Sequence, residues 1–202
     1  MAGEFSLLGP IGNWVRDVLQ SRRERQSATL DLAMSLEAFA QECACAIVDS
    51  ANERAQTGNC RPEDEDKISI VAIPLYSVPS HIKWRFVSPK VETDVKEYAE
   101  EVKRAHRRQD GVGFWADSVH SWMWEMERES ADLGVRAWRL ASILRAGAKP
   151  KLKSRNSIER DVMGVFADCL KRYEQQQHRI EVGNVKLSEE LGRTFSPTDP
   201  SS

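Results

Sequence analysis

The sequence predicts an all-α protein: a bundle of about four helices with an extended, proline-containing arm between the first two of them. Two observations support this fold class. Four stretches of the chain carry apolar residues at intervals of three and four, the spacing that places side chains on one face of a helix. Residues 68–87, in contrast, alternate poorly between apolar and polar side chains and contain two prolines, which disfavour a central strand.

The first bundle helix is predicted from about residue 27 to residue 55. Alanines within this stretch favour a helix and allow a neighbouring helix to approach closely. The TGN sequence at 57–59 supplies a stop signal. The apolar stripe consists of Leu32, Leu36, Phe39, Cys43 and Ile47.

The arm and the second helix follow a charged loop. Pro74 and Pro79 remove backbone donors, so we expect the arm to lie extended in a groove between helices, with one short edge strand as the alternative. Ser88 and Pro89 form an N-cap and first-turn pair that opens the second helix, and DGVG at 110–113 marks its end. The stripe of this helix is Val91, Val95, Tyr98, Val102 and Ala105.

The third helix is apolar on two sides. Its main stripe is Trp115, Val119, Trp122, Met126, Leu133, Ala137, Leu140 and Leu144. Trp124 and Trp138 project about 140° to 180° away from Trp115 on a helical wheel. We expect the arm to cover this second side, and the alternative is an exposed aromatic patch that binds another subunit or protein. Gly147 and Pro150 end the helix.

The fourth helix is predicted to begin at Ser157 as N-cap. Its stripe is Ile158, Val162, Phe166, Cys169 and Tyr173. The chain thus divides into an N-terminal apolar segment with a charged connector (1–26), a helical bundle domain (27–180) and a disordered tail (181–202). In the first part, Trp14, Val15, Val18 and Leu19 share one face of a short helix, and the connector at 20–26 is either a solvated helix or a hinge.

Composition limits the classes of function. The 202 residues are 41% apolar and 30% charged with a net charge of -2, so we expect no nucleic-acid partner. No apolar run approaches the roughly 20 residues of a membrane span. The start lacks the basic region of a secretory signal, and four cysteines without export context indicate free thiols and a cytoplasmic location. One basic cluster, either a solvated face or a phosphate-binding patch, comprises Lys149, Lys151, Lys153 and Arg155.

Candidate chemistry is limited to one pair of residues. Asp117 and His120 lie at i and i+3, so both could face one metal ion, but di-iron bundles need such a pair twice with further glutamates. We therefore expect no metal, no cofactor and no catalysis, and a metal-dependent helical-bundle enzyme that uses this pair is the alternative. Cys43 and Cys169 are predicted to be core residues, and Cys60 to be an exposed thiol.

Three stretches carry a resemblance to known proteins. LEAFAQECACAIVDS at 36–50, Trp84 before the second helix and ADLGVRAWRLASILR at 131–145 resemble a set of small helical bacterial hypothetical proteins without an assigned function. The resemblance covers about residues 30–147 and rests on alanine-rich helix. It implies a bacterial or phage source and nothing catalytic.

The sequence therefore predicts a protein that acts by association. The predicted interaction residues are Trp14 and Val18 in the N-terminal segment and Trp124 and Trp138 on the second side of the third helix. The partner is another protein or a second copy, with a homodimer as the symmetric outcome. The alternative is a peripheral membrane protein anchored by residues 5–19, on the cytoplasmic membrane surface.

Overall fold

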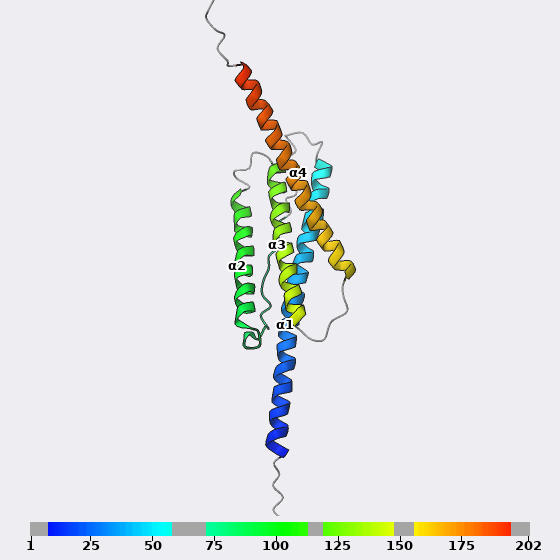
Figure 1. Ribbon diagram of the computed structural model, residues 1–202, viewed down its shortest axis with the longest axis vertical. Coiled ribbons are helices and arrows are strands. Elements are labelled where there is room, and N and C mark those ends of the chain that lie inside the picture. Colours follow the sequence, from blue (N-terminus) through cyan, green and yellow to red (C-terminus); the bar gives the residue numbers. More distant parts are fainter. Residues whose placement is uncertain (1–7, 58–71, 113–118, 148–155, 195–202) are drawn as a thin grey trace, which may run out of the picture.

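The computed structural model describes residues 8–57, 72–112, 119–147 and 156–194, and these form a bundle of four long helices (Figure 1). Within these ranges there is no strand, so the predicted all-α fold is confirmed. The helices are α1 (Leu8–Thr57), α2 (Pro89–Val112), α3 (Val119–Gly147) and α4 (Asn156–Thr194), with a short 3-10 turn, η2 (Trp84–Phe86).

Helices α1 and α3 form the centre of the bundle and contact each other along most of their shared length. The predicted stripe of α1 lies in this core, and its five members are each 2% exposed or less. Two ion pairs fix the antiparallel register, Glu37 with Arg145 and Arg54 with Glu127. The partners are 17 residues apart on α1 and 18 apart on α3, so both pairs specify the same alignment.

The chain before α2 lies between α1 and α2. Residues 72–83 contain no helix or strand, and they belong to the arm predicted over 68–87. The Tyr76 ring lies between Phe39 of α1 and Tyr98 of α2, with centroid distances of 5.5 Å and 5.6 Å. Aromatic rings at such separations attract each other beyond their buried area. Tyr76 therefore joins the two helices through the intervening chain.

The backbone of Ile73 is held by two side chains of α2. Its N–H donates to Oε1 of buried Gln109 at 2.9 Å, and its carbonyl lies 3.2 Å from Nδ1 of His106. Buried backbone groups need such partners when no neighbouring strand supplies them. Helix α2 itself begins as predicted, because the Ser88 hydroxyl accepts a hydrogen bond from the N–H of Val91 at 3.4 Å.

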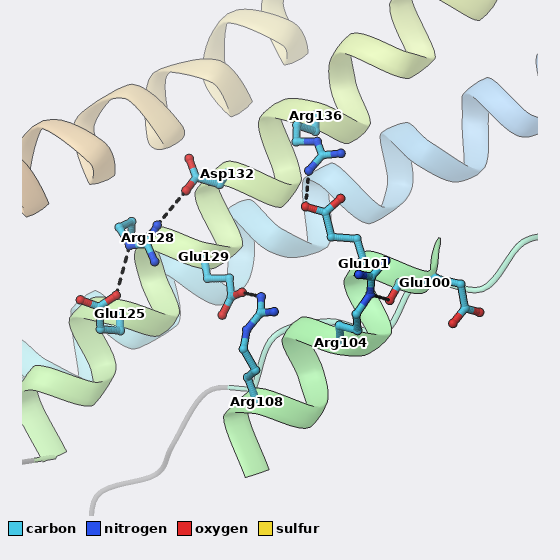
Figure 2. A network of polar contacts seen from close by, with 9 residues as sticks. All are labelled: Glu100, Glu101, Arg104, Arg108, Glu125, Arg128, Glu129, Asp132 and Arg136. Atoms are coloured by element: carbon cyan, nitrogen blue, oxygen red, sulfur yellow. Dashed lines mark hydrogen bonds and ion pairs between the residues drawn. The ribbon is translucent and has the colours of Figure 1, made fainter. Parts of the chain in front are cut away.

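The outer edges of α2 and α3 are joined by exposed ion pairs (Figure 2). Arg108 of α2 pairs with Glu129 of α3, and Glu101 of α2 pairs with Arg136 of α3. Exposed pairs of this kind contribute about 0–1 kcal/mol each. The buried stripe of α2, with Val95, Tyr98, Val102 and Ala105 all at 1% exposure or less, carries more of the packing.

Helices α1 and α4, and not the arm, make the described contacts around the second side of α3, where the sequence placed the arm: Arg54 of α1 lies over Trp124. Gly134 of α3 faces the Phe166 ring of α4, and Phe166 is fully buried. The described contacts of the arm go to α1 and α2 instead. The helical wheel showed that α3 has two apolar sides, but it carries no information on which element lies against each side.

The structure also bears on two predicted boundaries, deciding one open alternative and correcting one prediction. Helix α1 runs unbroken through the charged residues 20–26, so these form a helical connection and not a hinge. Helix α4 continues to Thr194, where the sequence predicted a disordered tail from residue 181. Residues 181–194 have no single apolar face that the bundle buries, but Glu, Lys, Leu and Arg among them favour a helix. The sequence 195–202 lies outside the described residues.

Candidate functional site

The first part of α1 projects beyond the bundle at one end of the molecule (Figure 1). Every side chain from Arg16 to Gln20 is exposed, with Val18 at 47% and Leu19 at 51%. Among the described side chains of the helix, which begin at Arg16, the first that is buried is Ala28. Residues 8–23 are called the N-terminal segment below.

The N-terminal segment combines apolar and basic residues. Trp14 lies in the helix four residues before Val18, so both positions are on one face, although the Trp14 side chain lies outside the described residues. Arg22, Arg23 and Arg25 follow within two turns and are all exposed. The bundle begins at the same turn, where Glu24 lies 4.0 Å from Arg85. This arrangement can bind an apolar surface that is flanked by negative charge.

Trp124 and Trp138, the other predicted interaction residues, lie inside the bundle. Trp138 is 6% exposed. It lies one turn after Gly134, on the side of α3 that faces α4. Trp124 is half-buried, and the Arg54 guanidinium lies over its ring at 3.6 Å from the centroid. Trp138 is therefore buried within the chain, and the Trp124 ring is partly covered by Arg54 of α1.

A buried polar cluster lies beside Trp124, where α1 meets α3. One oxygen of the Glu127 carboxylate, Oε1, accepts hydrogen bonds from Ser50 at 2.9 Å and from Arg54 at 2.5 Å. Glu127 is 1% exposed, and its other oxygen, Oε2, has no hydrogen-bond partner. Removal of one partner from such a cluster lowers the stability of the fold, because it leaves a buried charge unpaired. The cluster therefore favours the alignment of α1 and α3 in which its members meet.

The cysteine thiols near the core are unsuited to nucleophilic chemistry. Cys43 and Cys169 are fully buried, as predicted, whereas Cys45 is exposed. Burial raises the pKa of Cys169 to about 11, and the charge of Glu127 adds to this shift. Burial raises the pKa of Cys43 further. Both thiols stay protonated near neutral pH and are poor nucleophiles. Cys60 lies outside the described residues.

The predicted metal pair and basic patch fall largely outside the described part of the chain. Asp117 lies outside it, and His120 is in the first turn of α3 with a side chain that is not described. The patch at Lys149, Lys151, Lys153 and Arg155 also lies outside. Among the described residues, no three His, Cys, Asp or Glu side chains are grouped so that they could hold a metal ion.

The described surface includes three grooves. The largest of these, about 610 Å³, lies between α1 and α4, and a second, about 270 Å³, lies between α2 and α3. A third, about 210 Å³, lies between α1 and residues 81–83. The largest groove combines Asp168 with Lys171 and Arg172, so its charges are mixed. The residues that line it are Val48, Ala51, Asn52, Val165, Asp168, Lys171, Arg172 and Gln175, which include no histidine, cysteine or serine. The groove therefore has neither a nucleophile nor a base beside one.

The end of α4 was missed as a candidate surface. It projects from the bundle at the end opposite to the N-terminal segment (Figure 1). Every residue from 178 to 190 is exposed, including Ile180 at 45% and Leu187 at 57%. The sequence did contain a signal, because Phe166, Tyr173, Ile180 and Leu187 follow one another at intervals of seven.

Neither a membrane span nor a relative identifies the function. No helix in the described ranges has a stretch both long and apolar enough to cross a bilayer. No protein-family model, curated protein or solved structure matches the chain. Function is therefore inferred from the residues of the chain itself.

Proposed function

We propose that the protein acts by association, through the binding of its N-terminal segment to a groove on another protein. The observation that carries this proposal is the exposure of Val18 and Leu19 on a single helix that has left the bundle. A helix of this length without tertiary contacts is marginal in water, and most helical stability in proteins comes from the packing of an apolar face. A partner that buries this face would stabilise the segment.

The composition of the segment favours a particular kind of partner. An amphipathic helix binds by placing residues spaced by three, four and seven in an apolar groove. Trp14 and Val18 have this spacing, and large aromatic side chains contribute strongly to binding. The three exposed arginines after Gln20 would lie at the rim of such a groove, where acidic side chains of the partner speed association.

The binding role of Trp124 and Trp138 is not part of this proposal. Trp138 is buried against the rest of the chain, and the Trp124 ring is covered by Arg54, so their contribution is to the stability of the bundle. Catalysis is not proposed either. In the groove lined by Ser27, Asp31 and His81, the serine hydroxyl donates to Asp31 at 3.4 Å and His81 lies 3.7 Å from the same carboxylate, so the described contacts do not pair the serine with the histidine as a base.

The test is affinity capture from extracts of the native host, followed by mass spectrometry. The wild-type protein is compared with Val18→Glu/Leu19→Glu and with the control Gln20→Glu, a charge change at a neighbouring exposed position. We expect the same protein to be enriched by the wild type and by the control, and to be lost with the double variant. Recovery of identical proteins by all three would refute the proposal. Circular dichroism verifies that each variant remains helical.

A vesicle experiment separates the membrane alternative from this proposal. The wild type and the double variant are mixed with vesicles of phosphatidylcholine and phosphatidylserine and tested for flotation. An interfacial anchor requires the wild type to float and the double variant to remain in solution. Under our proposal neither protein floats, because the segment binds a protein groove.

A further inference from the structure

One face of α4, called the seam below, carries Phe166, Tyr173, Ile180 and Leu187. The first half of this face packs against the bundle, and the second half continues beyond it. Phe166 is fully buried and Leu170 is partly buried against the core. One turn later Tyr173 is still held, by a hydrogen bond from its hydroxyl to Glu125 of α3. Beyond the bundle the same face continues with Ile180 and Leu187, which are 45% and 57% exposed. The same face of α4 is therefore buried by the bundle in its first half and exposed to solvent in its second half.

This seam has the spacing of a coiled coil. Phe166, Tyr173, Ile180 and Leu187 occupy d positions, seven residues apart. The a positions, four residues after each of these, are Leu170, Gln177, Asn184 and Leu191. Apolar side chains that alternate in steps of four and three form the contact surface of two supercoiled helices. Residues 177–191 therefore follow an a–d–a–d–a pattern, in which Ile180 and Leu187 at d and Leu191 at a are apolar and Gln177 and Asn184 at a are polar. Every residue from 178 to 190 is exposed, so the d positions are available to a partner helix.

We propose that this surface pairs with the same surface of a second copy, in a parallel two-stranded coiled coil over residues 177–191. Asn184 is the residue that identifies the partner. In a parallel pair in register, Asn184 faces Asn184, and each side-chain amide has both a donor and an acceptor for the other. An asparagine at an a position is known to fix register and a two-stranded state.

Other pairings leave Asn184 worse placed. In an antiparallel pair, a positions face d positions, so Asn184 would face the apolar Ile180 or Leu187. A parallel pair shifted by one heptad would place one Asn184 against Leu191 and the other against Gln177. A buried amide without a partner costs about 1–3 kcal/mol. The side chains that flank Asn184 at the neighbouring e and g positions do not obstruct a parallel pair. Gly183 and Ser188 flank the seam and are small, so the two helices can approach closely at Asn184. The interface is then isologous, with the two chains related by a two-fold axis.

The proposal is tested by sedimentation equilibrium of the full chain from micromolar to near-millimolar concentration. The wild type is compared with Ile180→Glu/Leu187→Glu, which charges the seam. The matched control is Val182→Glu/Val185→Glu, because Val182 and Val185 are 40% and 58% exposed but lie at outer f and b positions. We expect a concentration-dependent dimer for the wild type and the control, and a monomer for the seam variant. A monomeric wild type, or a control variant that also dissociates, would overturn the proposal.

Register and direction are tested separately with Asn184→Cys in a Cys45→Ser/Cys60→Ser background, under an oxidising glutathione buffer; this background removes the exposed Cys45 thiol and the predicted exposed thiol of Cys60. In the parallel pair two thiols at 184 face each other and form a disulfide-linked dimer, whereas Glu189→Cys at an outer position does not. Equal cross-linking at both positions would contradict the assigned seam. The result is independent of the binding proposed for the N-terminal segment, because Val18→Glu/Leu19→Glu leaves the seam intact and is expected to dimerise like the wild type.

Discussion

Arg145 of α3 donates two hydrogen bonds to the carboxylate of Glu37 on α1, in a bidentate ion pair near one end of the central helix pair. Glu37 is 5% exposed. The hydrogen bonds from Arg145 hold the pKa of this guanidinium above its ordinary value. We expect Arg145→Met to destabilise the fold by about 2 kcal/mol or more, because it leaves a buried carboxylate without its guanidinium. Urea unfolding followed by circular dichroism measures this change.

The matched control for Arg145 is Arg139, an exposed residue on the same helix. Arg139→Met removes the same charge and should change stability by less than about 0.5 kcal/mol. Similar losses in the two variants would mean that the effect comes from net charge and not from the pair with Glu37.

A second prediction uses the close approach of α3 to α4. A methyl group at position 134 would overlap three atoms of the Phe166 ring, so Gly134→Ala should destabilise the protein by about 1–3 kcal/mol. Gly164→Ala makes the same change on the exposed side of α4, where a methyl group meets nothing within 4 Å. This variant should be more stable by about 0.5–1 kcal/mol, since alanine favours a helix over glycine. Changes of the same sign in both variants would contradict the described packing.

The third prediction distinguishes packing from association at Trp138. Because this ring is 6% exposed, Trp138→Ala should cost about 3–5 kcal/mol of unfolding free energy. Its sedimentation at native conditions should match the wild type. Trp124→Ala removes a half-buried ring and its contact with Arg54, so we expect a smaller loss. A Trp138→Ala protein of unchanged stability but altered assembly would instead place this residue at an interface.

The fourth prediction concerns alkaline pH. Burial raises the pKa of Cys169 from 9.0 to about 11, so above pH 9 the unfolded chain loses this proton before the folded chain does. Stability is therefore complete below about pH 9 and falls as the pH rises toward 11. One thiol contributes at most about 1.4 kcal/mol per pH unit to this fall.

The measurement for Cys169 is the unfolding free energy of wild type and Cys169→Ala across this pH range, in a reducing buffer. We expect the difference between the two proteins to shrink as the pH rises, because only the wild type has this thiol to ionise on unfolding. Other alkaline groups, such as Cys43 and Tyr98, are common to both proteins and cancel. Parallel pH curves for the two proteins would show that Cys169 is not buried as described.

The fold could be predicted wherever the buried face of a helix appears in the sequence as apolar residues at intervals of three and four. The stripe from Leu32 to Ile47 predicted the buried face of α1, because only apolar residues at helical spacing produce it. Residues 20–26 carry no such pattern, and in 181–194 only the sparse heptad spacing of Leu187 and Leu191 continues it. The helical state of both stretches follows largely from propensity and from continuity with a packed neighbour. The partner of Trp138 could not be predicted, since a helical wheel does not specify which helix lies opposite.

Among the predicted interaction residues with described side chains, Val18 is exposed, whereas Trp138 is buried and Trp124 is half-buried. Val18 is exposed as expected for an interaction residue, because nothing in the bundle extends far enough to cover it. The seam at Ile180 and Leu187 was hidden by the polar residues between them. Gln177 and Asn184 lower the average apolar content of this stretch, although such amides are tolerated inside coiled coils.

The central pairing of α1 with α3 has a consequence for the order of folding. The side-chain links between these helices join residues 73, 77 and 108 positions apart in the chain. A chain that makes its main contacts at such distances must close long loops first, and it folds more slowly than a bundle of sequential neighbours. During synthesis, α1 leaves the ribosome well before α3. The apolar stripe of α1 is therefore exposed to solvent until α3 has been made. Newly made chains should therefore bind chaperones for longer than four-helix proteins of similar size.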